Sequence, residues 1–362
     1  MGDSAVTAQG STSPKSAKSP KSASSPIEPG AATAGQALVA DENPDAHFEG
    51  DGDSTYDTEG GSDTTSLRSS IMKYRTENGR TYHAYKDGSY VLPNDDVEND
   101  RLDVQHNIFL LTFGGLHVAS FEKEPQRVLD VGCGTGIWSI DFADEHPESH
   151  VTGIDLSPIQ PPFVPPNVNF YVDDLEDDWN FSSPFDFIFA RFCTGSIVNW
   201  PKFFKQSFDN LNSGGIIELQ DIIFPTFCDD DTLPPDGPLK RWSDLLLECF
   251  ESVGRGITSA YLYPEQLAEA GFVDVNVVRE KWPTNRWPKD KRYKQIGIWN
   301  TDNMINALPS LSLALFTRPK EEGGLGWSLP ELEVLLAGVR KDIRDPSIHG
   351  YWKIHAVTAR KP

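Results

Sequence analysis

Cysteine is scarce in this sequence of 362 residues, which contains four in all and no C-x-x-C pair. Wide spacing of this kind excludes a disulfide framework and gives no pattern for a bound metal. The N-terminus has no apolar segment typical of a secretory signal. We therefore predict an intracellular protein without a metal ion, and the sequence leaves cytoplasm and nucleus open.

Basic residues are few, and long apolar runs are absent. The 32 lysines and arginines stand against 54 acidic residues, and the formal net charge is −22. A protein that binds a phosphate backbone needs a basic surface, so we predict no direct contact with nucleic acid. Apolar runs such as 108–113 and 222–227 are far shorter than the roughly 20 residues that span a bilayer, so we predict no membrane segment.

Residues 1–70 have few large apolar side chains and are rich in Ser, Pro, Ala, Gly, Thr and Asp. Such a segment cannot bury enough surface to offset the entropy lost on ordering, so we predict a disordered tail. Its Ser-Pro steps at 13–21 are candidate sites for proline-directed kinases. The remainder, 71–362, is long enough for one domain with a sizeable core.

Short apolar strands alternate with helices along this remainder. The predicted strands are 127–131, 151–154, 168–172, 185–190, 214–220, 272–280 and 352–357. The predicted helices are 97–121, 135–145, 201–211, 239–253 and 264–270. Alternation of this kind is typical of a doubly wound α/β fold, here a mostly parallel seven-stranded sheet of Rossmann-like type.

The predicted domain has four parts. Residues 71–126 form an N-terminal cap segment that ends in a helix, and 127–282 form the core that binds a ligand. Residues 283–350 interrupt the sheet with a helical insert that contains several tryptophans and is long enough to act as a lid. Residues 351–362 supply the last strand.

A glycine-rich loop follows the first strand of the core, where residues 128–136 read Val-Leu-Asp-Val-Gly-Cys-Gly-Thr-Gly. Glycines let the backbone turn sharply and let a ligand approach without meeting a Cβ. In a dinucleotide-binding loop the third glycine stands five positions after the first, where this chain has Ile137. An acid just before the loop would repel a pyrophosphate and suit an ammonium group, which favours a cofactor with an amino-acid part over NAD. The candidate cofactor-binding residues here are Asp130, Gly132, Cys133, Gly134, Thr135 and Gly136.

Two further carboxylates end the next two strands. Asp155 could accept the hydroxyl groups of a ribose, and Asp174 could accept the amine of an adenine. Parallel strands end at one edge of the sheet, so these acids are expected to line up with the glycine loop. We add the neighbouring Leu156 and Leu175 to the predicted cofactor contacts.

Together these residues resemble the class I, Rossmann-like methyltransferases that use S-adenosylmethionine, and the resemblance extends from about 71 to 362. A narrower resemblance is to the fungal LaeA-like group. It lies in Tyr-His-Ala-Tyr-Lys-Asp-Gly-Ser-Tyr-Val-Leu-Pro-Asn-Asp at 82–95, in Glu-x-x-Arg-Leu-Asp-x-Gln-His at 98–106 and in Gly-Ser-Ile-x-x-Trp-Pro at 195–201.

The resemblance implies S-adenosylmethionine as the cofactor. The group includes tailoring enzymes of fungal secondary metabolism and a nuclear regulator that acts with velvet proteins. Two functions therefore stand as alternatives: methylation of a small-molecule acceptor, or regulation through velvet-type protein partners. Asn107 stands where many members have a second histidine, which weakens the case for a working histidine pair.

Methyl transfer is an in-line displacement that depends mainly on positioning, and it needs a base only when the acceptor must lose a proton. His106 is the candidate base, and a structural role for it stands as the alternative. Arg101 is expected either to bind the cofactor carboxylate or to pair with the glutamate three positions before it. Arg191, Glu218 and Gln220 lie at strand ends and are expected near the cofactor or the acceptor.

Overall fold

The computed structural model describes residues 37–44, 74–83, 85–86 and 91–362. The Ser-Pro steps at 13–21 and most of the predicted tail lie outside these residues. A seven-stranded sheet forms the centre of the chain, in the order β5-β4-β3-β6-β7-β9-β8. Its strands are β3 (Arg127–Val131), β4 (His150–Asp155), β5 (Val168–Val172), β6 (Phe185–Arg191), β7 (Leu211–Phe227), β8 (Val273–Pro283) and β9 (Tyr351–Arg360).

The strand pairing confirms the predicted topology. Strands β5, β4, β3, β6 and β7 run parallel, while β9 is antiparallel to both β7 and β8. The chain starts at the centre with β3, builds outward to β5 and then returns to the other side with β6. Ligands of such sheets bind where the strand order reverses, beyond the carboxyl ends of the strands. Here that point lies between β3 and β6.

Helices cover both faces of the sheet, and the strand sequences show why. Along β3, Val128 packs into a cluster with α3 (Ile137–Glu145), whereas its neighbours Leu129 and Val131 pack into a cluster on the opposite face. Successive side chains of a strand point to opposite faces, so a strand that is apolar throughout needs cover on both. The second face is covered by α4 (Trp200–Asp209) and α6 (Tyr263–Ala270), with η1 (Ser259–Tyr261) just before α6.

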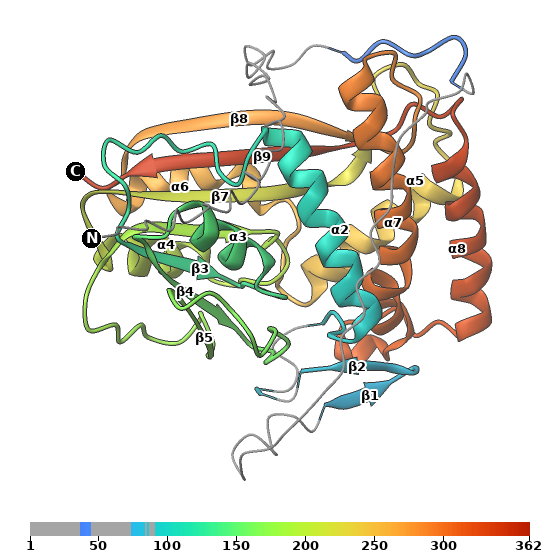
Figure 1. Cartoon of the computed structure of the whole chain (residues 1–362). Helices are drawn as coiled ribbons and strands as arrows, with labels where there is room; N and C mark the ends of the chain where they lie inside the picture. The colour runs from blue at the N-terminus through green and yellow to red at the C-terminus, as the bar shows by residue number, and fades with distance from the viewer. Residues whose placement is uncertain (1–36, 45–73, 84, 87–90) are drawn as a thin grey trace, which may run out of the picture.

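Four further helices gather at one end of the sheet around the largest apolar cluster (Figure 1). They are α2 (Asp96–Phe113), α5 (Pro238–Ser252), α7 (Lys291–Thr317) and α8 (Leu329–Arg344), with η2 (Lys320–Glu322) between the last two. The predicted insert thus consists mainly of α7 and α8. Among the described residues, none of the helices combines the length and the apolarity that crossing a membrane requires.

The first long helix is shorter than predicted. Asp95 caps its start by accepting a hydrogen bond from the Glu98 N–H, as the Asn-Asp-Asp sequence indicated. Its end comes at Phe113 and not at 121, because Gly114 adopts a φ of 75° and returns its N–H to the carbonyl of Leu110. Before this helix, β1 (Arg75–Glu77) and β2 (Arg80–Tyr82) form a hairpin where the sequence had indicated only irregular extended pieces.

Residues 37–44 correct the predicted extent of the disordered tail. Their backbone forms an isolated bridge at Ala40 and Pro288, and the Asp41 N–H donates to the carbonyl of Trp287. The Asp41 carboxylate also forms an ion pair with Lys294 at the start of α7. Disorder is therefore the wrong prediction for this stretch, because a backbone bridge and an ion pair hold it on the insert.

Candidate functional site

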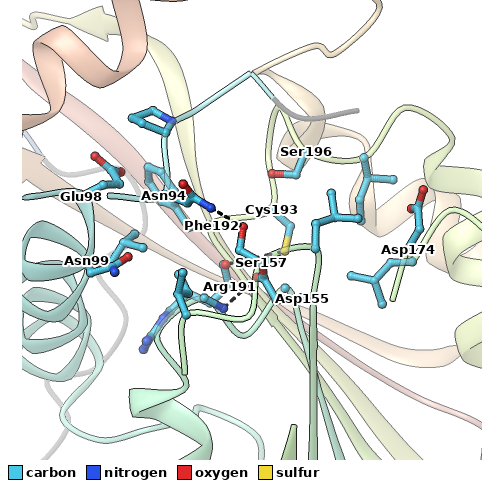
Figure 2. A pocket seen from close by; sticks show the side chains of 18 of the residues that line it. Asn94, Glu98, Asn99, Asp155, Ser157, Asp174, Arg191, Phe192, Cys193 and Ser196 are labelled. Carbon is cyan, nitrogen blue, oxygen red and sulfur yellow. Dashed lines mark hydrogen bonds between the residues drawn. The ribbon is translucent and has the colours of Figure 1, made fainter. Parts of the chain in front are cut away.

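A cavity lies between α2 and the carboxyl ends of β3, β4, β5 and β6 (Figure 2). Residues 93–102 form one wall, and the opposite wall consists of residues that follow the four strands. Among the described residues of the insert, 283–350, none lines this cavity. The insert packs behind α2 through α7 and so supports a wall of the site, and its role as a lid stays a prediction.

The three glycines of the loop have different roles. Gly132 and Gly134 line the cavity with φ values of 66° and 53°, which favour glycine. Gly136 has a φ of 80°, and a Cβ there would lie 2.4 Å from Cζ of Phe170 on β5. The first two glycines therefore leave room for a ligand, and the third lets the loop pack against the sheet.

Asp155, at the end of β4, links this strand to the glycine loop through a hydrogen bond. Its Oδ2 accepts a hydrogen bond from the Gly134 N–H at 2.9 Å, and its Oδ1 accepts one from the Ser157 N–H at 2.8 Å. Burial raises the pKa of this carboxyl. Both Asp155 and Leu156 line the cavity, as predicted, and each carboxylate oxygen has a further lone pair for a ligand hydroxyl.

Asp174 and Leu175 also line the cavity. The Lys86 ammonium lies 2.9 Å from Oδ2 of Asp174, and it contacts Asp177 as well. The Glu176 N–H donates to Oδ1 of Asp174 at 2.9 Å. Beyond the end of β5, neighbours therefore hold both carboxylate oxygens of Asp174 in place, and the apolar Leu175 lies beside it.

Besides Gly136 and Arg101, three predicted contacts lie outside the cavity wall. The buried Asp130 accepts a hydrogen bond from the Ser139 hydroxyl at 2.6 Å, and burial raises its pKa to about 7. Cys133 is buried, which raises the pKa of its thiol well above the ordinary range. The Thr135 hydroxyl donates to Asp103 at 2.8 Å. Contrary to the prediction, these three side chains face the supporting elements and brace the loop from behind.

Arg101 forms the ion pair that was the alternative to a cofactor contact. Its Nε and Nη2 donate to Oε1 of Glu98 at 3.0 and 2.6 Å, and its Nη1 donates to Asn303 of α7 at 2.8 Å. Glu98 and Arg101 are both buried. The structure favours the ion pair for Arg101, because all three nitrogens face protein partners, and a cofactor contact of Arg101 stays a prediction.

Both ring nitrogens of His106 have protein partners. The Arg191 guanidinium can only donate, so its Nη2, at 2.8 Å, must give its hydrogen to Nδ1 of His106. Nε2 then carries the proton and donates to Asp141 at 2.9 Å. Burial lowers the pKa of His106. With both nitrogens engaged and the ring outside the cavity wall, the geometry favours the alternative of a structural role, and the role of His106 as a base stays a prediction.

Arg191 lies where the prediction placed it, in the cavity wall at the end of β6. Its guanidinium lies over Phe109 at 5.1 Å and near Phe189 at 5.9 Å. Burial lowers its pKa to about 10, so the group stays charged at neutral pH. Its Nη1 is buried and has no hydrogen-bond partner among the described residues. This donor is available to an anionic ligand group.

Glu218 and Gln220 do not reach the cavity. The Glu218 carboxylate accepts hydrogen bonds from the N–H groups of Val118 and Ala119 and from the Gln220 side chain. Burial raises the pKa of Glu218 to about 7. Hydrogen bonds of both residues instead hold the segment that connects α2 to β3.

Comparison with known proteins now assigns the family. A family model described as a methyltransferase domain matches residues 104–277. Methyltransferase pytC of Aspergillus terreus is 38% identical over 303 residues, covering 83% of this chain and 92% of the relative. The chain belongs to this family of methyltransferases.

Two other relatives of this methyltransferase are named for regulation or for protein methylation. Secondary metabolism regulator LAE1 of Cochliobolus heterostrophus is 38% identical over 294 residues, covering 79% of this chain and 94% of the relative. Protein-methionine methyltransferase laeA of Emericella nidulans is 34% identical over 296 residues, covering 80% of this chain and 77% of the relative. The predicted class I, LaeA-like family, with S-adenosylmethionine as its cofactor, is thereby confirmed.

The side chains of this methyltransferase fit that cofactor. Gly132 and Gly134 expose backbone without a Cβ, Asp155 offers carboxylate oxygens, and Arg191 offers an unpartnered donor, all on one cavity. The cavity also contains residues that were not predicted as contacts: Asn94, Glu98, Asn99, Ser157, Phe192 and Ser196. The motifs at 82–95, 98–106 and 195–201 contained four of them, but no individual role could be read from those motifs.

Proposed function

We propose that this methyltransferase transfers a methyl group to a small-molecule acceptor of secondary metabolism. S-adenosylmethionine supplies an electrophilic methyl group on a sulfonium. The chain's own residues bind and orient this cofactor: Asp155 accepts from the ribose hydroxyls, Asp174 from the adenine amine, and Gly132 and Gly134 let the backbone approach. Arg191 contributes a fixed positive charge. Positioning of this kind is the main source of rate in a displacement that needs no bond to the protein.

The observation that carries a small acceptor is the rigid enclosure of the cavity. On one side, Glu176 accepts hydrogen bonds from the N–H groups of Val198 and Asn199 at 2.9 and 3.1 Å, while Arg255 contacts both Glu176 and the carbonyl of Ser196. These contacts fix the loop after β6. On the other side, α7 supports α2 through its contacts to Glu98 and Arg101. A site between two braced walls suits a compact molecule better than a folded protein surface.

Metabolite profiles of three strains test this proposal. One lacks the protein, one carries Asp155→Ala and one carries Asp144→Ala, an exposed aspartate on α3 that serves as the matched control. Loss of the same metabolites in the first two strains, with the control unchanged, is the expected result. An Asp155→Ala profile that matches the unmodified strain would refute a metabolic role for methylation.

A second candidate is LaeA-like regulation through velvet-type protein partners. It is supported by LAE1, which is as similar to this chain as pytC is, at 38% identity. This alternative expects a nuclear reporter fusion and co-purification with velvet-type proteins that survives the Asp155→Ala change. A cytoplasmic fusion with no such partners, together with turnover of one metabolite, would exclude it.

A further inference from the structure

Two buried polar atoms in the cavity wall lack hydrogen-bond partners among the described residues. One is a donor, Nη1 of Arg191, and the other is an acceptor, Oδ1 of Asn99. Both residues line the cavity. Buried polar groups are nearly always satisfied, so an unpaired donor and an unpaired acceptor in one cavity indicate a ligand that supplies both complements.

The two atoms belong to the same side of the cavity. Asn99 lies on α2, and Figure 2 shows it with Arg191 on the helix side, away from Asp174 on the opposite side. Leu102, one turn further along α2, lies close to the glycine loop: its Cδ1 is 3.7 Å from the position of a Cβ on Gly134. Glu98, Asn99 and Leu102 therefore line the same cavity as Gly134 of the glycine loop.

Among the side chains of 98–102 that line the cavity, Asn99 is the acceptor without a partner among the described residues. Oε1 of the adjacent Glu98 accepts from Arg101, and its Oε2 accepts from the Ser310 hydroxyl at 2.5 Å. The Glu98 carboxylate is thus already occupied on both oxygens. Arg191 has its Nη2 on His106, which leaves its Nη1 for the cavity.

We propose that Asn99 and Arg191 hold the two ends of the cofactor's α-amino acid group, the ammonium on Oδ1 of Asn99 and the carboxylate on Nη1 of Arg191. This inference rests on the proposed cofactor contacts, and it adds the subsite that binds the amino-acid part of the cofactor. A zwitterion provides one donor end and one acceptor end, which matches the two unpaired atoms. The nucleoside end then lies toward Asp155 and Asp174.

His106 acts in this subsite as a positioning residue. Its Nδ1 holds Nη2 of Arg191, and its Nε2 is anchored on Asp141 of α3. These contacts fix one edge of the guanidinium and leave its Nη1 without a partner among the described residues. Loss of the imidazole releases one edge of the guanidinium without removing its charge.

Calorimetry with two ligands tests the assignment. S-adenosylhomocysteine contains the amino-acid group, and 5′-methylthioadenosine contains the nucleoside and thioether without it. Asn99→Leu removes the acceptor at similar size. We expect this substitution to lower the affinity for S-adenosylhomocysteine about 10- to 100-fold, the range for a lost hydrogen bond to a charged group. The affinity for 5′-methylthioadenosine should change less than about twofold.

The matched control is Asn107→Leu, the same substitution at an exposed position of the same helix. It should leave the affinities for both ligands unchanged. Asn99→Asp keeps an acceptor oxygen and should preserve the preference for S-adenosylhomocysteine. His106→Leu should reduce that preference without weakening 5′-methylthioadenosine, which a merely structural role would not do.

Equal weakening of both ligands by Asn99→Leu, or no weakening of either, would overturn the amino-acid subsite. Binding of 5′-methylthioadenosine by the unaltered protein reports on the nucleoside contacts alone. An unaltered protein that binds neither ligand would refute the cofactor contacts, and with them the subsite.

Discussion

The two walls of the cavity are built in different ways. At the ends of β3 to β5, the backbone of a few neighbouring strands places the glycines and acids: the Gly134 N–H bonds Asp155, only 21 residues later. Along α2 and the end of β6, partners from distant parts of the chain place the side chains, such as Arg101 and Asn303, which are 202 residues apart. Local sequence therefore specifies the first wall, whereas packing of the insert specifies the second.

The largest effect should come from breaking the second wall. Arg101→Met removes the main partner of the buried Glu98, and an uncompensated buried charge costs about 3–5 kcal/mol. We expect the free energy of unfolding to fall by that amount in a urea titration. Glu98→Gln added to Arg101→Met should recover part of the loss. If Arg101→Met unfolded normally but lost S-adenosylhomocysteine binding, Arg101 would be a cofactor ligand after all.

A steric test of the first wall comes next in size. Gly136→Ala places a Cβ at 2.4 Å from Phe170 on a backbone with a φ of 80°, whereas Gly134→Ala has its nearest neighbour at 3.7 Å. Positive φ alone costs an alanine about 1–2 kcal/mol, so Gly136→Ala should cost clearly more than that and Gly134→Ala about that much. Equal losses in thermal unfolding would mean that Phe170 moves aside.

Cofactor affinity should respond most at Asp155. Asp155→Ala removes the acceptor for a ribose and also frees the Gly134 N–H, so S-adenosylhomocysteine should bind about 100-fold more weakly. Asp144→Ala, on the exposed side of α3, should have no effect in the same titration. A loss below threefold at Asp155 would show that the strand-end acid serves the loop and not the ligand.

The smallest expected effect is a pH dependence of stability. Burial lowers the pKa of His106 below its ordinary value of 6.5, so the folded state prefers the neutral ring that accepts from Arg191. The stabilisation is complete above pH 6.5 and is lost as the pH falls through the folded pKa. His106→Gln should flatten this part of the curve of melting temperature against pH. An unchanged slope would exclude the Arg191 hydrogen bond.

The two walls also differ in how far their residues could be predicted from the sequence. Asp155, Leu156, Asp174 and Leu175 could be placed in the cavity because parallel strands end together and the glycine loop fixes which edge binds. Arg101 and His106 could not, because the same helix positions suit a ligand contact or an internal ion pair equally. The residues that decide between these outcomes, such as Asn303 and Asp141, carry no local signal of the contact.

The hairpin shows a different reason for a missed element. Asn78 and Gly79 have φ values of 51° and 78°, the left-handed pair that a two-residue β-turn of this kind uses. The Asn-Gly dipeptide was a sufficient local signal, but the flanking strands β1 and β2 are only three residues long each. Strands that short do not show the alternation on which a strand prediction depends.

The position of β9 between β7 and β8 has a consequence for synthesis on the ribosome. When residue 283 has been made, the glycine loop and all the strand-end acids exist, but β8 has no neighbour in the sheet until residues 351–360 arrive. The support of α2 by Asn303 and Ser310 also comes late. A nascent chain thus carries the nucleoside contacts well before it has a braced helix wall, so tight cofactor capture should coincide with emergence of the C-terminal part.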